Sequence, residues 1–229
     1  MEKTSAYILK TDFLKNFELW DSLLPFLSEK RRESILSCKR PEDQICSLGA
    51  GLLLCYALKE AGQKRPFPQI LFTHYGKPYF KDNPFYFNLS HSKSEVMCLL
   101  SSSEVGCDIE SVSDPVYAIA KKRFCKEEAN YLDSISDEKE KARSFYRFWT
   151  IKESTLKTLG RGLSLPLNSF CIDFSSPKLS VHTEEEQKLL YYKEYNLSKD
   201  FCCSCAAYCP EALPSSIHML DHLTLEDLL

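Results

Sequence analysis

The clearest hydrophobic repeat in the first half of the chain has the spacing of an amphipathic helix. Apolar side chains recur every three or four residues, at Leu48, Leu52, Leu53, Tyr56 and Ala57. Because this is the repeat of one helical face, it predicts a helix over residues 28–59. Gly62 and Pro66 then end the helix, and the frequent prolines that follow predict a loop-rich stretch over 66–84.

Three strand-like segments follow in the middle of the chain. Residues 85–90 and 105–110 alternate between apolar and other side chains, and 96–100 is a continuous apolar run. Successive side chains of a strand point to opposite faces, so these segments predict β-strands. The short polar stretch Ser101–Glu104 predicts a hairpin that joins the second segment to the third.

The second half of the chain is predicted to be helical first and strand-like afterwards. The segments with helical spacing are 117–122, 126–132 and 138–159. Gly160 follows the longest of them, as glycine often does where a helix ends. The apolar runs typical of strands are 170–174, 188–195 and 201–208.

Predicted helices and strands alternate along the chain without a strict βαβ rhythm. A weak division falls near Cys107–Pro115, and nothing there resembles a flexible linker. We therefore expect two halves, 1–107 and 108–229, that pack together rather than forming independent domains. A chain of 229 residues can bury an extensive core without help from a metal or a disulfide.

Composition excludes several classes of protein. Hydrophobic residues are 44% and charged residues 27% of the chain, which is typical of a soluble globular protein. The net charge of −3 offers no basic excess for a nucleic acid. The longest apolar run, Leu48–Leu58, is too short to span a bilayer, and the N-terminus lacks the apolar core of a signal peptide. We expect a cytoplasmic protein that binds neither membranes nor nucleic acids.

Cysteine is unusually frequent, with eleven residues in the chain. Without an export signal, these cysteines are expected to be reduced thiols. Four of them crowd residues 202–209, but their spacing lacks the paired C-x₂-C pattern of zinc sites. Because that segment is apolar, its cysteines are interpreted as small core residues.

Asp108 and Glu110 form the first candidate site. Residues two apart in a strand point to the same face, so the two carboxylates lie together while Val105, Cys107 and Ile109 face the core. Neighbouring carboxylates repel each other unless a cation lies between them, and oxygen ligands favour Mg²⁺. An ordinary solvated strand face is the alternative interpretation.

The helix predicted over 138–159 carries the second candidate site. Glu153 and Lys157 are four residues apart on one face, as in an ordinary surface ion pair. Lys152 is more unusual, because it falls on the apolar stripe between Trp149 and Leu156. A lysine at such a position either extends its ammonium to water or meets an anion.

The segment Asn88–Ser92 supplies hydroxyl groups and an imidazole at the predicted end of a strand. A turn of this composition is suited to holding a phosphate group. A Ser–His nucleophile pair is the competing interpretation, but adjacent residues rarely face each other as members of a catalytic triad do. The segment is therefore not interpreted as a hydrolase site.

Four motifs together resemble one protein family over roughly the whole chain. Asn88–Ser92 resembles its N-x-S-H-S motif, and Gly106–Glu110 resembles its G-[IV]-D-[IV]-E motif with a cysteine at the second position. Phe148–Lys157 resembles its W-x-x-K-E-[AS]-x-x-K motif, and Gly76–Pro78 its G-K-P motif. The family is the Sfp-type 4′-phosphopantetheinyl transferases. Each motif alone is weak, but the four occur in the family's order and spacing.

The resemblance implies an α+β fold. It also implies a pseudo-twofold monomer, in which two similar α/β halves hold the active site in the cleft between them. The reaction it implies moves the 4′-phosphopantetheine arm from coenzyme A, the co-substrate, to a serine hydroxyl. That serine would belong to an acyl or peptidyl carrier protein or domain, and the second product would be 3′,5′-ADP.

The resemblance also implies roles for individual residues. Asp108, Glu110 and Glu153 would bind Mg²⁺, with Mn²⁺ as an alternative, to neutralise charge on the pyrophosphate. The expected catalytic residues are Glu153, which itself or through a nearby water takes the serine proton, and Lys157. The residues expected to bind coenzyme A are Lys30, Arg40, Lys77, Pro78, Ser90, His91, Lys152 and Lys157.

The sequence departs from the family in the segment that recognises the ribose 3′-phosphate. Lys30 matches a basic position of relatives, but a second basic position one turn later falls on Glu33. An arginine and a small hydroxyl residue of relatives fall on Ile45 and Cys46. Arg40 lies nearby and is expected to substitute.

Two other hypotheses stand beside the transferase. A non-catalytic relative that binds coenzyme A or a carrier would suit the altered 3′-phosphate segment, although the complete set of acidic and basic site residues argues against it. An unrelated Mg²⁺-dependent phosphoryl transferase is the third hypothesis. Against it, the chain lacks both the G-x-x-x-x-G-K-[ST] loop and a kinase-type glycine-rich loop.

Overall fold

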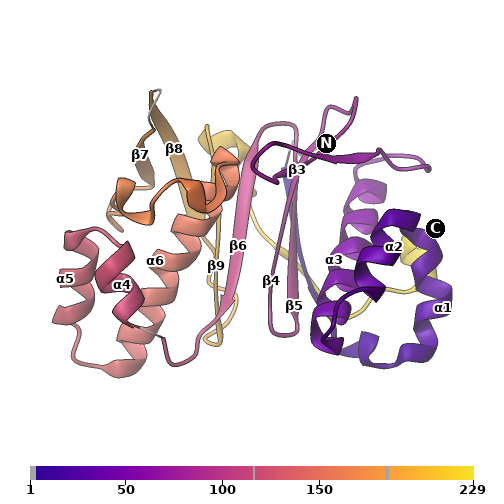
Figure 1. Cartoon of the computed structure of the whole chain (residues 1–229), viewed down its shortest axis with the longest axis horizontal. Helices are drawn as coiled ribbons and strands as arrows, with labels where there is room; N and C mark the ends of the chain where they lie inside the picture. Colours follow the sequence, from indigo (N-terminus) through magenta and orange to yellow (C-terminus); the bar gives the residue numbers. More distant parts are fainter. Residues whose placement is uncertain (1–3, 116, 184–185) are drawn as a thin grey trace.

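The computed structural model describes residues 4–115, 117–183 and 186–229. Over these residues the chain forms two four-stranded sheets, a two-stranded ribbon and seven α-helices (Figure 1). The expected combination of helices and strands in one chain is confirmed. No helix in the described ranges has both the length and the apolar composition needed to cross a membrane.

The helices and strands have the following bounds. The α-helices are α1 (Trp20–Leu23), α2 (Glu29–Leu36), α3 (Pro41–Glu60), α4 (Tyr117–Arg123), α5 (Lys126–Ser134), α6 (Glu138–Leu159) and α7 (Leu225–Leu228). The strands are β1 (Thr4–Lys10), β2 (Ile70–Phe72), β3 (Pro78–Phe80), β4 (Tyr86–Ser92), β5 (Glu95–Ser101), β6 (Val105–Ser111), β7 (Lys178–His182), β8 (Gln187–Glu194), β9 (Phe201–Ala207) and β10 (His218–Leu220). Helix α6 coincides with the helix predicted over 138–159.

The first sheet draws strands from both ends of the chain, in the order β10-β1-β5-β4. Strands β1 and β4 flank β5 in antiparallel register, and β10 pairs with β1 in parallel. Helix α3 packs on this sheet and buries Leu48, Leu52 and Leu53 completely. The last strand of the chain therefore joins the N-terminal half, while the expected boundary between 1–107 and 108–229 falls inside β6 and stays a prediction.

The single helix predicted over 28–59 is in fact two helices, α2 and α3. Ser28 caps the first by accepting a hydrogen bond from the Arg31 backbone N–H, at 3.4 Å. The break lies at residues 37–40, immediately before Pro41. Proline disfavours helical backbone in the preceding residue but is well suited to the first position of a new helix, which explains the interruption.

The second sheet is antiparallel throughout, in the order β6-β9-β8-β7, and α6 packs across β6 and β9. The close approach of α6 depends on Gly106. A Cβ atom at this position would collide with the backbone carbonyl of Ser154 and would lie 2.5 Å from the backbone nitrogen of Thr158. Gly106, two residues before Asp108, therefore lets α6 lie directly against β6.

The predicted hairpin between 96–100 and 105–110 is wrong. Both segments form strands, but β5 already pairs with β1 on one edge and with β4 on the other. With no edge of β5 left, β6 pairs with β9 and begins the second sheet. Residues 102–104 therefore connect the two sheets, and the actual hairpin joins β4 to β5.

Two further strand predictions need correction. Residues 170–174 form no strand; the second sheet uses β7 instead, a segment that the apolar-run criterion missed because only Leu179 and Val181 are apolar and buried. Strand β1 was also not predicted. Its inner side chains alternate between the two faces of a sheet that is covered on both sides, so the strand lacks a simple amphipathic pattern.

A shared apolar layer joins the two sheets. It contains Ile8 and Met97 from the first sheet and Val105, Cys107 and Ile109 from β6. The expectation that these three β6 side chains face the core is confirmed. Because the apolar side of β6 is anchored here, its other face, with Asp108, is directed toward α6. Cys202, Cys203 and Cys205 of β9 are buried as well, as the core interpretation of the cysteine-rich segment requires.

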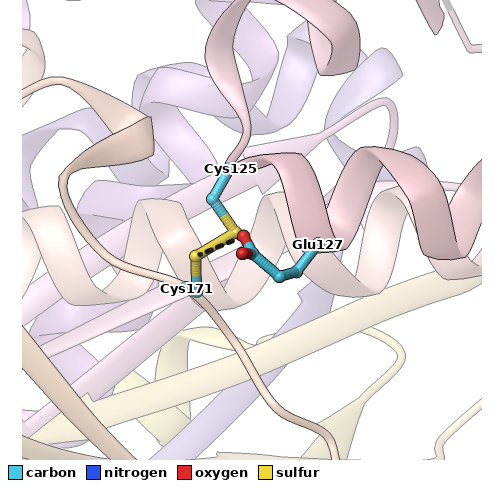
Figure 2. Close-up of side chains that lie close together, drawn as sticks. All are labelled: Cys125, Glu127 and Cys171. Carbon is cyan, nitrogen blue, oxygen red and sulfur yellow. Dashed lines mark hydrogen bonds between the residues drawn. A yellow bond between two sulfur atoms is a disulfide. The ribbon is translucent and has the colours of Figure 1, made fainter.

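One pair of cysteines contradicts the expectation that all are reduced. Cys125, at the start of α5, and Cys171 form a disulfide with a Cα–Cα distance of 5.8 Å (Figure 2). The two residues are 46 positions apart, so only the tertiary fold brings them together. Glu127 lies beside them, but because the two sulfurs are bonded to each other this trio is not an open metal site.

Candidate active site

Strand β4, strand β6 and helix α6 meet around one pocket of about 370 Å³. Six of the side chains singled out from the sequence line it, together with Leu89 and Trp149: Ser90, His91, Asp108, Glu110, Glu153 and Lys157. The three segments are far apart in the sequence. The fold therefore collects most of the predicted site residues at one place, where the second sheet and its helix meet the edge of the first sheet.

Asp108 is the most enclosed carboxylate of the pocket, with a side chain only 4% exposed. Its Oδ1 atom accepts hydrogen bonds from Ser90 Oγ and Lys157 Nζ, both at 2.7 Å. Its Oδ2 atom is buried and has no hydrogen-bond partner among the described residues. A buried anionic oxygen without a partner is costly, so this atom is suited to receiving a ligand.

Glu110 and Glu153 line the pocket with Asp108, and the charge of Asp108 contributes to raising the pKa of both. Burial, followed by the charge of Asp108, raises the pKa of Glu110 to about 7, although Ser92 Oγ donates a hydrogen bond to it at 2.9 Å. The same two causes, in the same order, raise the pKa of Glu153. The repulsion shows that the pocket holds more negative charge than its own groups neutralise.

Lys157 provides the positive charge of the pocket. Its Nζ atom donates to Asp108 Oδ1 at 2.7 Å, to Ser90 Oγ at 3.0 Å and to the Cys107 carbonyl at 3.1 Å. Burial is the largest single influence and opposes the charged form, but the charge and hydrogen bond of Asp108 together with other nearby groups outweigh it, so the pKa of Lys157 is raised. The ammonium is therefore permanently charged near neutral pH and is fixed in position by three acceptors.

A divalent cation fits this set of residues. Three carboxylates face one ammonium, and the Oδ2 atom of Asp108 is a buried oxygen without a partner. Carboxylate oxygens are the donors that Mg²⁺ and Mn²⁺ accept, and a cation would remove the repulsion that raises the two glutamate pKa values. Asp108, Glu110 and Glu153 are thus suited to holding the metal.

Ser90 and His91 lie within β4, not in a turn as expected. Ser90 is buried, and its hydroxyl already bonds Asp108 and Lys157. Partial burial, followed by the ammonium of Lys157, lowers the pKa of His91, so its imidazole is neutral near neutral pH. Of these two residues, His91 is therefore the one whose polar atoms remain available to a ligand.

Lys152 does not reach the pocket, contrary to the role expected from the sequence. Its side chain is 0% exposed, and its Nζ atom contacts Glu128 Oε1 at 2.9 Å. The same atom donates to the carbonyls of Leu167, at 2.7 Å, and Phe170, at 2.8 Å. The ammonium is therefore enclosed in the protein interior and does not face the pocket, which a contact with phosphate would require.

Glu128, the partner of Lys152, was missed by the sequence analysis. It is 1% exposed and also accepts the backbone N–H groups of Cys125, at 3.1 Å, and Ile172, at 2.7 Å. A glutamate three residues after a helix cap is a recognisable capping-box signal. That signal predicts the bond to Cys125, but not the ion pair with a lysine in another helix.

The remaining predicted residues lie outside the lining of the pocket. Lys77 Nζ donates to the Thr158 carbonyl at 2.8 Å, which satisfies a free carbonyl near the end of α6, and Pro78 begins β3. Lys30 lies 5.9 Å above the ring of Phe72. Arg40 is exposed beside acidic neighbours at the start of α3. Their roles toward coenzyme A stay predictions.

Arg31 is a basic residue that the sequence analysis did not select. Its guanidinium donates to the Ser47 carbonyl at 2.9 Å, between α2 and α3. Burial lowers its pKa, and its charge contributes to lowering the pKa of His91. The sequence signal was present, because Arg31 lies in the basic run that includes Lys30, but the sequence could not show which of these side chains turns inward.

Comparison with known proteins gives a consistent result. The family model of the 4′-phosphopantetheinyl transferase superfamily matches residues 104–206. The 4′-phosphopantetheinyl transferase ffp of Bacillus subtilis is 32% identical over 210 residues, which cover 90% of this chain and 92% of that protein.

Two other relatives agree. The 4′-phosphopantetheinyl transferase Sfp of Bacillus subtilis (strain 168) is 31% identical over 88% of this chain and 91% of that protein. The 4′-phosphopantetheinyl transferase gsp of Aneurinibacillus migulanus is 36% identical over 62% of this chain and 60% of that protein. The match to the family model includes β6 and α6, two of the elements that build the pocket. With relatives above 30% identity that cover about nine-tenths of it, the chain belongs to the 4′-phosphopantetheinyl transferase superfamily.

Proposed function

We propose that this protein transfers the 4′-phosphopantetheine arm of coenzyme A to a serine of an acyl or peptidyl carrier protein. Membership of the family supports this reaction. The structural observation that carries it is the meeting of Asp108, Glu110 and Glu153 beside Lys157, with one buried carboxylate oxygen left without a partner among the described side chains. Such a set is suited to a metal and to a phosphate-rich substrate.

The arrangement of the two sheets supports a pseudo-twofold molecule with coenzyme A in the cleft between its halves. Each half has a four-stranded sheet with one long helix packed on it, α3 in the first and α6 in the second. The pocket takes side chains from β4 of the first sheet and from β6 of the second. In this proposal one chain supplies both sides of the cleft, and the protein acts as a monomer.

The chemistry of the pocket suits phosphoryl transfer to a hydroxyl group. A metal held by Asp108, Glu110 and Glu153 would supply charge neutralisation on the pyrophosphate. Lys157 lies next to these carboxylates and presents a fixed ammonium toward the phosphate being transferred. Glu153 lines the same pocket, and it is the carboxylate that takes the serine proton in this proposal, directly or through water. The products are then the holo-carrier and 3′,5′-ADP.

Recognition of the coenzyme is assigned to one residue of the pocket and to mostly basic residues outside its lining. His91 lines the pocket itself, while Lys30, Arg40, Lys77 and Pro78 come from α2, α3 and the β2–β3 ribbon and its turn. Arg31 joins this set. It is a further basic side chain of α2, and we propose that it takes the place of the basic position that Glu33 lacks. Lys152 leaves the set, because its ammonium is enclosed by Glu128 and two carbonyls.

The test is the intact mass of apo carrier proteins incubated with this protein, coenzyme A and Mg²⁺. We expect a mass gain of one phosphopantetheine arm, lost when EDTA is added. Glu153→Gln should abolish the gain, whereas Glu138→Gln, an exposed change in the first turn of the same helix, should leave it intact.

The non-catalytic hypothesis gives a different result in the same experiment. Coenzyme A would then bind, but no carrier in a panel of acyl and peptidyl carriers would gain mass, with or without Mg²⁺. That outcome would overturn the transferase proposal and direct attention to the segment around Ile45 and Cys46.

A further inference from the structure

Strands β4 and β6 lie side by side although they belong to different sheets (Figure 1). β6 is an edge strand, because β9 pairs with only one of its edges. Every second N–H group of β6 therefore points away from its own sheet. These groups are buried, and buried backbone donors without a partner are costly.

Side chains of β4 supply the missing acceptors. The N–H of Cys107 donates to Asn88 Oδ1 at 2.9 Å, and the N–H of Ser111 donates to Ser92 Oγ at 3.0 Å. Between them, the N–H of Ile109 is 3.4 Å from Ser90 Oγ. The spacing is two residues on both strands, so side-chain oxygens replace the carbonyls that a neighbouring strand would offer. We call Asn88, Ser90 and Ser92 the side-chain ladder.

The ladder is connected directly to the carboxylates. Ser90 Oγ donates to Asp108 Oδ1 at 2.7 Å, and Ser92 Oγ donates to Glu110 Oε2 at 2.9 Å. Each serine thus fixes a carboxylate with its proton and accepts the next backbone N–H with its oxygen. A single hydroxyl sets both the position of the strand and the orientation of a candidate metal ligand.

We propose that Asn88 and Ser92 are positioning residues for the divalent metal, acting by fixing β6 and its two carboxylates against β4. The proposal rests on the proposed function, since it concerns the metal site of that reaction. It also explains the alternation of polar side chains in Asn88–Ser92. Ser90 contacts the pocket directly, whereas Asn88 and Ser92 act through β6 and Glu110.

Ser92→Ala is the decisive variant, with Ser92→Thr as the conservative change and the exposed Ser102→Ala as the matched control. The first readout is Mn²⁺ affinity of the protein with coenzyme A present, measured by calorimetry without any carrier. We expect Ser92→Ala to weaken Mn²⁺ about tenfold, in line with the loss of a hydrogen bond to a charged group. Ser92→Thr should stay close to the wild type.

The second readout separates metal positioning from other roles. In the transfer reaction, Ser92→Ala should need about tenfold more Mg²⁺ for half-maximal rate, while kcat at saturating Mg²⁺ stays within about threefold of the wild type. Coenzyme A affinity in EDTA should not change. Asn88→Ala should show the same metal dependence. If that variant fails to fold, Ser92→Ala carries the test.

Three outcomes would overturn the proposal. Wild-type Mn²⁺ affinity in a folded Ser92→Ala protein would show that the hydroxyl does not position the site. A loss of coenzyme A affinity in EDTA as large as the loss of Mn²⁺ affinity would mean that Ser92 contacts the coenzyme. A fall in kcat that saturating Mg²⁺ does not restore would show that Ser92 affects a step other than metal binding. If the wild type binds Mn²⁺ but modifies no carrier, the proposed function fails and the affinity measurement still decides the role of Ser92.

Discussion

Lys152 and Lys157 lie five positions apart on one helix, yet their ammonium groups have opposite surroundings. Lys157 lines the pocket beside Asp108, whereas Lys152 is enclosed with Glu128 under the segment 167–170. The resemblance to the family implied a coenzyme A-binding role for both, although only Lys152 departs from the apolar stripe of the helix. What separates them is the position of Glu128, which belongs to a different helix and cannot be paired with Lys152 from the sequence.

At this buried pair, removing one partner should cost far more stability than removing both. Glu128→Ala leaves an ammonium buried without its counter-charge, and we expect the free energy of unfolding to fall by about 3–5 kcal/mol. The double variant Glu128→Gln with Lys152→Met should lose less than Glu128→Ala alone. Urea unfolding measures both, and a cost below about 1 kcal/mol for Glu128→Ala would contradict the assigned structural role.

Glu110 should make the stability of the metal-free protein depend on pH. Its pKa is about 7 in the folded chain, above the value of an unfolded glutamate, so the folded state binds more protons between pH 4.5 and 7. The contribution of Glu110 to stability therefore decreases as the pH rises through this window. Thermal unfolding in EDTA should show the decrease, and Glu110→Gln should flatten it. A steeper slope in that variant would contradict the raised pKa.

At the scale of elements, the pairing of strands was harder to predict than their existence. The pattern placed β4, β5, β6 and α6 within a few residues of their observed bounds. It could not show that β5 is already flanked on both edges, so it joined β5 to β6 in a hairpin. Likewise, Pro41 divides a continuous apolar repeat into α2 and α3. Local periodicity reports which face is buried, but not which element covers it.

The contact between β6 and α6 predicts a strong effect of Gly106→Ala. The new methyl group would meet the backbone of α6, which cannot move aside as a side chain can. We expect a loss of at least about 2 kcal/mol in urea unfolding. Gly51→Ala is the matched control, because the methyl group there meets side-chain atoms only, the end of Leu27 at 3.0 Å and Arg31 Nε at 3.7 Å. Equal costs for the two variants would show that α6 can shift away.

At the scale of the molecule, the site depends on contacts between segments that are far apart. The motifs identified the family and most of the pocket residues, because chemistry-bearing side chains occur at short, regular spacings. The return of the C-terminus to the first sheet was not predictable. β10 is only three residues long, and two of them are exposed, so it carries no hydrophobic repeat of its own.

This return predicts that the tail contributes to the stability of the N-terminal half. Leu223 and Leu228 are buried in the core of the first sheet and α3. Removing residues 217–229 exposes that core, and we expect the melting temperature to fall by at least about 5 °C. Removing only Leu229, which is 80% exposed, should have little effect. A truncated protein that melts like the full chain would show that β10 and α7 are dispensable.

The bond between Cys125 and Cys171 makes the chain sensitive to the reducing agents around it. Closing a loop over 46 residues stabilises a folded protein by about 4 kcal/mol in the chain-entropy description. We expect dithiothreitol to lower the melting temperature of the wild type, and to leave unchanged a variant with serine at both positions. The disulfide lies beside the N–H groups of Cys125 and Ile172, which Glu128 accepts. In a buffer that contains thiols the bond is reduced, and the attachment between α5 and the segment after α6 becomes weaker. The protease resistance, storage lifetime and yield of the protein would then depend on the thiol concentration of the solution as well as on the sequence.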